Sequence, residues 1–302
     1  MKFTKTNLNE IRDSSSSQKI DVGRSKKYST ILQILKYWME INMNKRKDKE
    51  YIRIGIPGFD RLFQHGIPKG SAVLVAGGTG SGKTNFCLQL LAYHASRGKK
   101  CYFMGFGEPE ERLIEHMNDF GWEPQKLIKS GNLKIKRFLT SEIYYYDQKS
   151  GSGIQAMMTK EVDPLLMELE PLALTEEVGF KPDFIVLDSL SAVSSTFKGK
   201  ERSYRIYVER LFRFFEGIGS TTFLITETKQ IPEVFSPIGV EEFLADGVIV
   251  FYNFKRENIR ETGIEILKMR GEKHQKKIVA MKITDKGIIV YPDQEVFGTL
   301  EE

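Results

Sequence analysis

The residues best suited to chemistry form one run, Gly77-Gly78-Thr79-Gly80-Ser81-Gly82-Lys83-Thr84. Its glycines allow the backbone to fold so that several N–H groups face one anion, and a helix that begins here adds the positive end of its dipole. The spacing is that of a Walker A phosphate loop, in which Lys83 reaches the β- and γ-phosphates and the Thr84 hydroxyl takes one position on Mg²⁺. The run therefore predicts a binding site for ATP and Mg²⁺.

The flanks of this run decide between a phosphate loop and an ordinary glycine-rich turn. Residues 72–76 are all apolar or small, and residues 85–97 carry apolar side chains at helical spacing. The order strand, loop, helix is the context that a Walker A motif requires. We therefore favour the phosphate loop over the turn.

A second candidate is Asp188, which follows the apolar residues Phe184-Ile185-Val186-Leu187. A buried strand that ends in a carboxylate is the Walker B pattern, and the carboxylate holds Mg²⁺, usually through water. Four apolar residues before an aspartate are a weak signal alone. The preceding phosphate loop makes it stronger, so we assign Asp188 to the metal together with Thr84.

A third candidate is Glu108, which lies just beyond the predicted strand 100–106. In a parallel α/β sheet the ligand lies beyond the carboxyl ends of the strands, so a carboxylate here is placed to activate water as a general base. The alternative is that the acidic residues only favour the amino end of the next helix. We prefer that alternative for Glu110 and Glu111, and the base for Glu108.

Strands and helices must alternate to position these groups, so we expect one α/β domain with a mostly parallel central sheet flanked by helices. A hairpin at Asp285-Lys286-Gly287 is expected to add antiparallel strands at its carboxyl end. The chain has 302 residues, 40% of them hydrophobic, which is enough to bury a core. Cys87 and Cys101 are expected to be reduced core residues, and the lack of a secretion signal or a long apolar run predicts a cytoplasmic protein without a membrane span.

The chain divides into an extension, a domain and a tail. Residues 1–50 carry 12 lysines or arginines and 6 acidic residues, a net charge of +6, which exceeds the net charge of +5 of the whole chain. The polar run Ser14-Ser15-Ser16-Ser17 predicts disorder, and the spacing of apolar residues over 31–41 predicts one amphipathic helix. We expect this helix to pack on its own domain, on a protein partner or on an acidic surface. We expect residues 51–292 to form the domain and residues 293–302 a tail.

Three segments in this order resemble the opening of the KaiC-type ATPases, a branch of the RecA-like superfamily: GIPGFD from Gly55, GIPKGS from Gly66, and the phosphate loop. The resemblance covers about residues 52–292 and implies a RecA-like P-loop NTPase core. KaiC-like proteins usually carry two adjacent glutamates at the strand tip where this chain has Gly107 and Glu108. Only the second is kept, which leaves the hydrolysis rate open.

The string Lys268-Met269-Arg270-Gly271, with His274 after it, resembles the second signature of KaiC-like domains. Strand alternation places Lys268 and Arg270 on the same face, and such pairs are common on solvated strands. The resemblance implies instead that both reach the γ-phosphate in the neighbouring subunit. It therefore implies a homo-oligomeric ring, expected to be a hexamer.

The segments after the strands that end at Asp188 and Glu227 show whether the protein is suited to bind nucleic acid. Residues 197–205, expected to form a loop, contain four basic residues, whereas residues 228–246 carry Glu233, Glu241, Glu242 and Asp246 against Lys229. Acidic residues repel phosphate, so DNA or RNA is not favoured as a partner.

Glu227, at the end of the strand before residues 228–246, is a place for a polar γ-phosphate sensor. Autokinase activity is not expected, because Glu241-Glu242-Phe243 stands where self-phosphorylating KaiC domains carry hydroxyls.

We expect a KaiC-like ATPase that hydrolyses MgATP between the subunits of a ring, with Lys83, Glu108, Lys268 and Arg270 as its catalytic residues. Two alternatives stay open: a RadA-like protein that grips DNA, and a scaffold that binds ATP, barely turns it over and signals through its ring.

Overall fold

The computed structural model describes residues 49–138 and 178–296, except residues 198, 231, 233 and 257. Contacts divide the chain into residues 1–49 and 50–302. The predicted serine-rich disorder, the amphipathic helix and most of the carboxyl-terminal tail lie outside the described residues. The boundaries that we assigned to extension, domain and tail remain a proposal.

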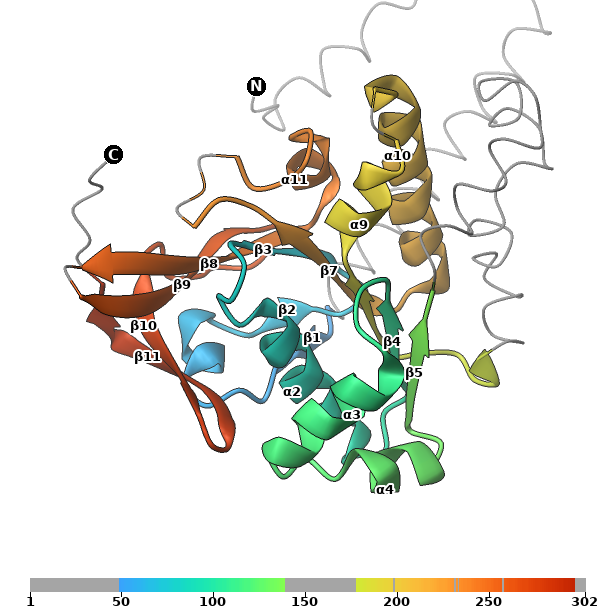
Figure 1. The fold of residues 1–302 in the computed structure, drawn as a ribbon, viewed down its shortest axis with the longest axis horizontal. Helices are drawn as coiled ribbons and strands as arrows, with labels where there is room; N and C mark the ends of the chain where they lie inside the picture. Colours follow the sequence, from blue (N-terminus) through green and yellow to red (C-terminus); the bar gives the residue numbers. More distant parts are fainter. Residues whose placement is uncertain are drawn as a thin grey trace, which may run out of the picture. The chain divides into compact units, whose positions relative to one another are not determined.

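The main sheet of the described residues has nine strands in the order β11-β10-β9-β8-β3-β7-β6-β4-β5 (Figure 1). The six strands from β8 to β5 in this order are parallel, and β9, β10 and β11 continue the sheet antiparallel. The strands are β3 (Ala72–Gly77), β4 (Cys101–Gly105), β5 (Leu133–Arg137), β6 (Phe184–Asp188), β7 (Thr221–Glu227), β8 (Gly247–Arg256), β9 (Ile259–Met269), β10 (Val279–Thr284) and β11 (Gly287–Glu295). This confirms the α/β fold with a mostly parallel sheet and antiparallel carboxyl-terminal strands.

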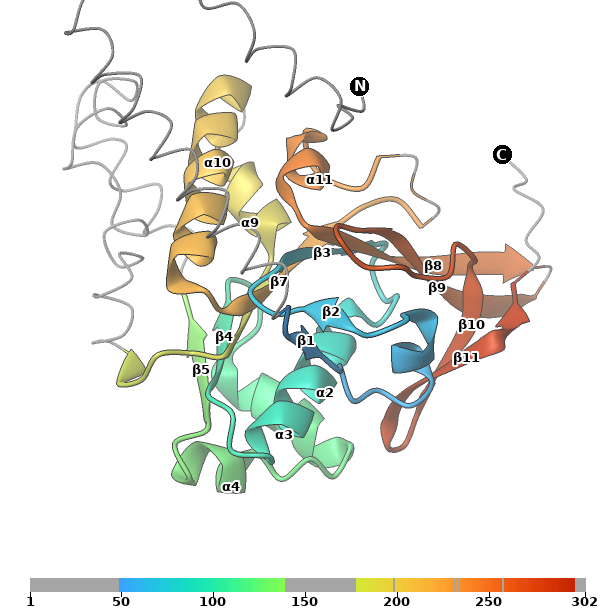
Figure 2. The same ribbon diagram turned by 180° about the vertical axis from the view of Figure 1, so that it is seen from behind.

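Helices cover both faces of the sheet, as the opposite views in Figure 1 and Figure 2 show. One face carries α2 (Lys83–Ala95), α3 (Glu110–Asp119) and α4 (Pro124–Lys129), with the short helix η2 (Phe59–Leu62) and the pair β1 (Tyr51–Ile52) and β2 (Ile67–Pro68). The other face carries α9 (Leu190–Ser195), α10 (Glu201–Ile218) and α11 (Val240–Leu244). The prediction of a loop over residues 197–205 is wrong in its second half, because α10 begins at Glu201.

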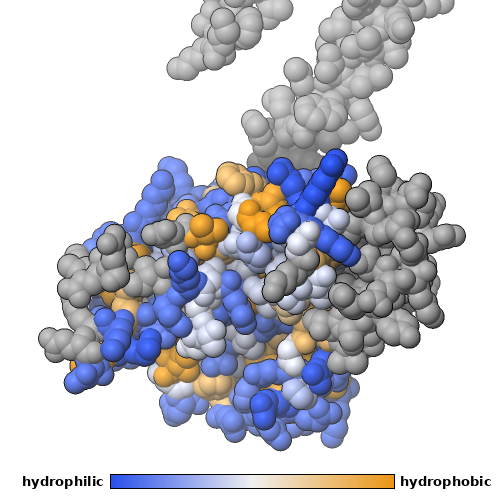
Figure 3. Space-filling model, turned by 45° about the horizontal axis from the view of Figure 1, so that its top comes forward, coloured by the Kyte–Doolittle hydropathy of each residue, from blue (hydrophilic) through white to orange (hydrophobic). Residues whose placement is uncertain are grey.

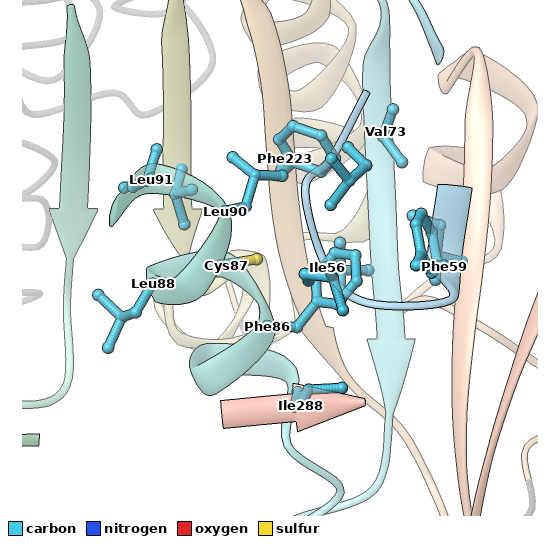
Figure 4. Close-up of a cluster of buried hydrophobic side chains, with 14 of the residues drawn as sticks. Ile56, Phe59, Val73, Phe86, Cys87, Leu88, Leu90, Leu91, Phe223 and Ile288 are labelled. Atoms are coloured by element: carbon cyan, nitrogen blue, oxygen red, sulfur yellow. The ribbon is translucent and has the colours of Figure 1, made fainter. Parts of the chain in front are cut away.

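Strand alternation divides the core between the two faces. Val73 and Val75 of β3 face the cluster under α2, whereas Ala72 and Leu74 face the cluster under α10. Figure 4 shows Phe86 and Leu90 of α2 directed toward the sheet, in the same cluster as Phe223 of β7. Because both faces of the parallel strands are buried, their sequences are nearly continuous apolar runs.

The two cysteines lie in this core as expected. Cys87 and Cys101 are free and buried, and burial raises the pKa of both thiols. Neither is therefore placed to act as a nucleophile.

The surface of the described part is mostly polar, with scattered hydrophobic patches on the face in Figure 3. The exposed apolar side chains include Val234, Phe243 and Ile259. Among the described residues, no helix has the length and apolar character needed to cross a bilayer.

Candidate nucleotide site

The phosphate loop connects the carboxyl end of β3 to α2, as the sequence predicts. Lys83 is the first residue of α2, and Gly82 before it has φ of 98°, a conformation that favours glycine. The Lys83 ammonium is buried and donates hydrogen bonds to the Gly77 and Gly78 carbonyl oxygens, at 2.9 and 2.8 Å. Burial lowers the pKa of Lys83, while the carboxylates of Glu227 and Asp188 oppose this effect.

The segment after β7 holds the phosphate loop from outside, a contact that the sequence does not predict. Gln230 Nε2 donates to the Thr79 carbonyl oxygen at 3.2 Å, and the Thr228 N–H donates to that of Gly77 at 3.1 Å. A Cβ on Gly78 would lie 2.6 Å from Gln230 Oε1. Gly78 is therefore required by the close approach of this segment.

Ser81 is the buried polar residue of the loop. Its side chain is fully buried, and its Oγ has no hydrogen-bond partner among the described residues. A Cβ on Gly77 would lie 2.9 Å from this oxygen. The two residues are therefore packed against each other inside the loop.

Thr84 and Asp188 meet across the site. Thr84 Oγ1 donates a 2.7 Å hydrogen bond to Asp188 Oδ2. Burial raises the pKa of Asp188, and the Thr84 hydrogen bond and the Lys83 charge oppose this. A hydroxyl and a carboxylate are suitable donors for Mg²⁺, which usually keeps several waters and takes few protein ligands. Among the described residues, no group of three His, Cys, Asp or Glu side chains surrounds one ion position.

A cleft of about 320 Å³ opens beside this pair, and its lining includes Thr84, Gly107, Glu108, Asp188, Ser191 and Glu227. Glu108 therefore shares a cleft with the predicted metal residues. Its side chain is 46% exposed, and its Oε2 lies 3.6 Å from Nδ1 of His116, a residue that the sequence did not indicate. The space beside Gly107 is open, since a Cβ there would meet nothing within 4 Å.

The other acidic residues of this turn lie elsewhere. Glu110 Oε1 accepts a hydrogen bond from the Arg137 N–H at the end of β5, at 3.0 Å. Glu111 is exposed in the first turn of α3. Neither lines the cleft, which agrees with our preference for Glu108 as the base.

Glu227 ends β7 and is the third carboxylate of the cleft. Its backbone N–H donates to Ser191 Oγ at 2.8 Å, which ties the strand end to α9. The charges of Glu227 and Glu108 both raise the pKa of Asp188 further. The cleft is therefore acidic, and the nearby Lys83 charge opposes the rise in the pKa of Asp188.

Lys268 and Arg270 do not join this cleft. Both point to the carboxyl end of α11: Lys268 Nζ donates to the Glu242 and Ala245 carbonyl oxygens at 2.8 and 2.6 Å, and Arg270 Nη2 donates to that of Phe243 at 2.6 Å. Lys268 in β9 and Arg270, the residue after this strand, therefore point to the same side, as predicted.

The strand register shows how far the cations lie from the phosphate loop. Met269, between them, pairs with Gly247 of β8, and Gly247 pairs with Val73 near the amino end of β3. The phosphate loop begins at Gly77, four residues further along the same strand, or about 13 Å at the usual rise. Within one chain, Lys268 and Arg270 therefore lie where the parallel strands begin, and the candidate nucleotide residues lie where these strands end.

His274, the last residue of the second signature, has a structural contact. It forms an isolated antiparallel bridge with Phe63 beside η2. Its Nδ1 lies 3.4 Å from the Glu272 carbonyl oxygen.

Comparisons with known proteins agree with this geometry. The family model described as the KaiC ATPase matches residues 52–295. A UPF0273 protein of Aeropyrum pernix is 32% identical over 81% of this chain and 95% of its own length. The circadian clock protein KaiC3 of Synechocystis sp. is 33% identical over 80% of this chain, which spans about half of that relative, 46% of its length.

A solved structure is similar over the same region. The crystal structure of a KaiC-like protein from the hyperthermophilic archaeon Pyrococcus horikoshii matches 81% of this chain and all of its own chain, with a TM-score of 0.64 and 29% identity. The similarity supports a KaiC-like, RecA-type arrangement of the sheet and helices.

Proposed function

Because the chain belongs to the KaiC ATPase family, we propose that it hydrolyses MgATP at sites shared between neighbouring subunits of a ring, expected to be a hexamer. The observation that carries this proposal is the position of the two groups at opposite ends of the parallel strands. The phosphate loop, Asp188 and Glu108 lie where the parallel strands end, and Lys268 and Arg270 lie where β8 and β3 begin. Head-to-tail packing of identical subunits would bring the second group of one chain to the first group of the next.

In this proposal each nucleotide residue has one role. Backbone N–H groups of Gly77, Gly78, Thr79, Gly80, Ser81 and Gly82 surround the phosphates. Lys83 leaves the Gly77 and Gly78 carbonyls and pairs with the β- and γ-phosphate oxygens. Thr84 and Asp188 hold Mg²⁺, which would neutralise phosphate charge when bound. The Thr84–Asp188 bond and the acidic cleft support this assignment.

Glu108 is the general base in this scheme. It lies in the cleft with Asp188, and its exposed carboxylate can accept a proton from water. Lys268 and Arg270 of the neighbouring subunit complete the site by stabilising charge on the transferring phosphoryl group. Autokinase activity is not part of the proposal, because Glu242 and Phe243 offer no hydroxyl beside the two cations.

One observation favours a second candidate, the ATP-gated scaffold with little turnover. Gly107 leaves open space where a KaiC-like protein carries the first of two glutamates. A single carboxylate would slow hydrolysis without preventing nucleotide binding. DNA binding is not favoured, because the acidic side chains of the segment after β7 that reach the surface, those of Glu242 and Asp246, repel phosphate. We further propose a cytoplasmic protein whose basic extension binds a protein partner.

The test is the ATPase rate of the full chain together with its mass in solution, with and without ATP and single-stranded DNA. We expect hydrolysis and an ATP-dependent ring, with neither changed by DNA. Tight ATP binding with negligible turnover would favour the scaffold, and salt-dependent DNA affinity would favour the RadA-like alternative. No ATP binding would contradict the proposal and both alternatives.

A further inference from the structure

One carbonyl oxygen of the phosphate loop is held from outside the loop. Within the loop, Lys83 Nζ donates to the Gly77 and Gly78 carbonyl oxygens. The Thr79 carbonyl oxygen takes its bond from another segment, because Gln230 Nε2 donates to it at 3.2 Å. In the described part of the chain, the direction of the Thr79 carbonyl therefore depends on a side chain that the Walker A motif does not include.

The residue after Thr79 makes this direction important. Gly80 has φ of 76°, in the left-handed region that favours glycine. A flip of the peptide group between Thr79 and Gly80 would turn this φ to a negative value, which glycine adopts about as readily. The loop sequence alone therefore does not fix the direction of this peptide group.

The direction of the peptide group decides where the Gly80 N–H points. In a trans peptide the C=O and N–H bonds point to opposite sides. Because the Thr79 carbonyl points outward to Gln230, the Gly80 N–H points the other way, toward the interior of the loop. A flip would turn the carbonyl oxygen inward instead. A bound phosphate would then lose a backbone donor and meet a partial negative charge.

Gln230 is held in place by the backbone of its own segment. Its carbonyl oxygen accepts a hydrogen bond from the Asn253 N–H of β8 at 3.4 Å. Two residues earlier, the Thr228 N–H donates to the Gly77 carbonyl oxygen at 3.1 Å. The segment after β7 is therefore attached to β8 and to the end of β3. The Gln230 side chain thus extends from a backbone that is fixed relative to the loop.

Gly78 is independent evidence for this contact. The Walker A spacing requires glycine at Gly77 and Gly82 but not at position 78. The φ of Gly78 is not positive, so its backbone conformation does not require glycine either. A Cβ at this position would lie 2.6 Å from Gln230 Oε1 and 2.9 Å from Gln230 Cα. The close approach of Gln230 therefore accounts for a glycine that the motif leaves unexplained.

We propose that Gln230 is a positioning residue for ATP. It holds the peptide group between Thr79 and Gly80 in the orientation in which the Gly80 N–H can bind phosphate, before the nucleotide arrives. This inference rests on the proposed ATP site and adds a residue that does not itself touch the nucleotide. A loop that is already in its binding conformation lowers the cost of binding. Gln230 should therefore affect nucleotide affinity more than the chemical step.

The test compares ATP and ADP binding to the full chain and to Gln230→Met by calorimetric titration. Methionine is unbranched like glutamine, but its thioether cannot donate a hydrogen bond. We expect the Kd of both nucleotides to rise about 5- to 10-fold, the factor that corresponds to one hydrogen bond. The kcat at saturating ATP should change by less than about 2-fold, because Gln230 acts on binding. An unchanged Kd would overturn the inference.

Two further variants control for the size and chemistry of the new side chain. Gln125→Met makes the same change at an exposed position of α4 and should bind ATP like the wild type. Gln230→Ala removes the side chain without crowding Gly78, and it should weaken binding as Gln230→Met does. Wild-type affinity in Gln230→Ala would show that methionine acts by crowding, and this result would also overturn the inference.

A double variant separates positioning of the peptide group from a general effect on the loop. A Cβ on Gly80 would meet nothing within 4 Å, so Gly80→Ala acts through the backbone, where it disfavours the positive φ. Gly80→Ala should itself raise the ATP Kd. In that background Gln230→Met should change the Kd by less than about 2-fold, because the peptide group has already left its binding orientation. Effects that multiply would contradict the positioning role.

Failure of the inference and failure of the proposed function give different results. A wild type that does not bind ATP would overturn both. ATP binding to the wild type with the same affinity in Gln230→Met would overturn the inference alone. The expected loss of affinity in a protein that does not hydrolyse ATP would support the inference and favour the scaffold.

Discussion

Thr84 Oγ1 donates a 2.7 Å hydrogen bond to Oδ2 of Asp188, 104 residues further along the chain. A hydroxyl that donates its proton to a carboxylate still has oxygen lone pairs to offer a metal ion. The bond can therefore persist while Thr84 binds Mg²⁺, and it orients the hydroxyl before the metal arrives. Two motifs that are recognised separately in the sequence become one site through this contact.

Replacing Asp188 by asparagine tests this contact. Asp188→Asn removes the negative charge while keeping the side chain's size, so the Mg²⁺ concentration for half-maximal activity should rise by about 10-fold or more. ATP binding without metal should stay the same. A Mg²⁺ titration of the ATPase measures the effect, and Asp119→Asn, at an exposed position of α3, is the control. An unchanged Mg²⁺ requirement would remove Asp188 from the metal site.

Lys83→Ala should abolish tight ATP binding and turnover while leaving the fold intact. In the described part of the chain, the hydrogen bonds of the Lys83 ammonium go to loop carbonyls, and the Gly77 oxygen keeps its bond from the Thr228 N–H. Calorimetric ATP titration and circular dichroism of the same sample separate the two effects. Unchanged ATPase activity would overturn the Walker A assignment.

Glu108→Gln should keep MgATP binding and lower kcat by roughly 10²-fold or more, the usual effect of removing a positioned base. The amide has nearly the same shape but cannot accept the proton. Glu111→Gln, in the same turn but outside the cleft, should have little effect. A larger loss in Glu111→Gln would show that we chose the wrong carboxylate.

Local patterns were enough to predict most of the candidate site, because each candidate nucleotide residue lies at a strand end or in the loop after it. Residues 77–84, Glu108 and Asp188 could be assigned this way, and the parallel order of the strands followed from the same spacing. Gln230 could not be found, because its contact with Thr79 depends on how the segment after β7 folds back. The carbonyl partners of Lys268 were missed for the same reason. Strand alternation predicts the side of the strand on which Lys268 lies, but it does not predict that α11 packs against that side.

His94 predicts a pH dependence of stability that is independent of nucleotide. Its ring is buried and stacked on Phe184 with centroids 3.8 Å apart, and burial lowers the pKa of His94 to about 4. The unfolded chain binds this proton below about pH 6.5, whereas the folded chain binds it only near pH 4. The stabilising contribution is therefore complete above pH 6.5 and is lost as the pH falls toward 4.

The expected loss is on the order of 2 kcal/mol in the free energy of unfolding between pH 7 and pH 5. Urea unfolding of the wild type and of His94→Leu at both values measures it. The difference between the two proteins should shrink or change sign at pH 5, because only the wild type carries the histidine. A difference that does not depend on pH would contradict the assignment.

The most direct test of the shared site is to mix two inactive variants, Lys83→Ala and Arg270→Ala. In a ring, an interface between the intact phosphate loop of one variant and the intact Arg270 of the other has wild-type composition. In rings assembled at random from a 1:1 mixture, about a quarter of the interfaces have this wild-type composition. The variants are mixed before assembly, and ring formation is confirmed before ATP is added. The account predicts recovery near a quarter of the wild-type rate, and no recovery from properly mixed rings would contradict it.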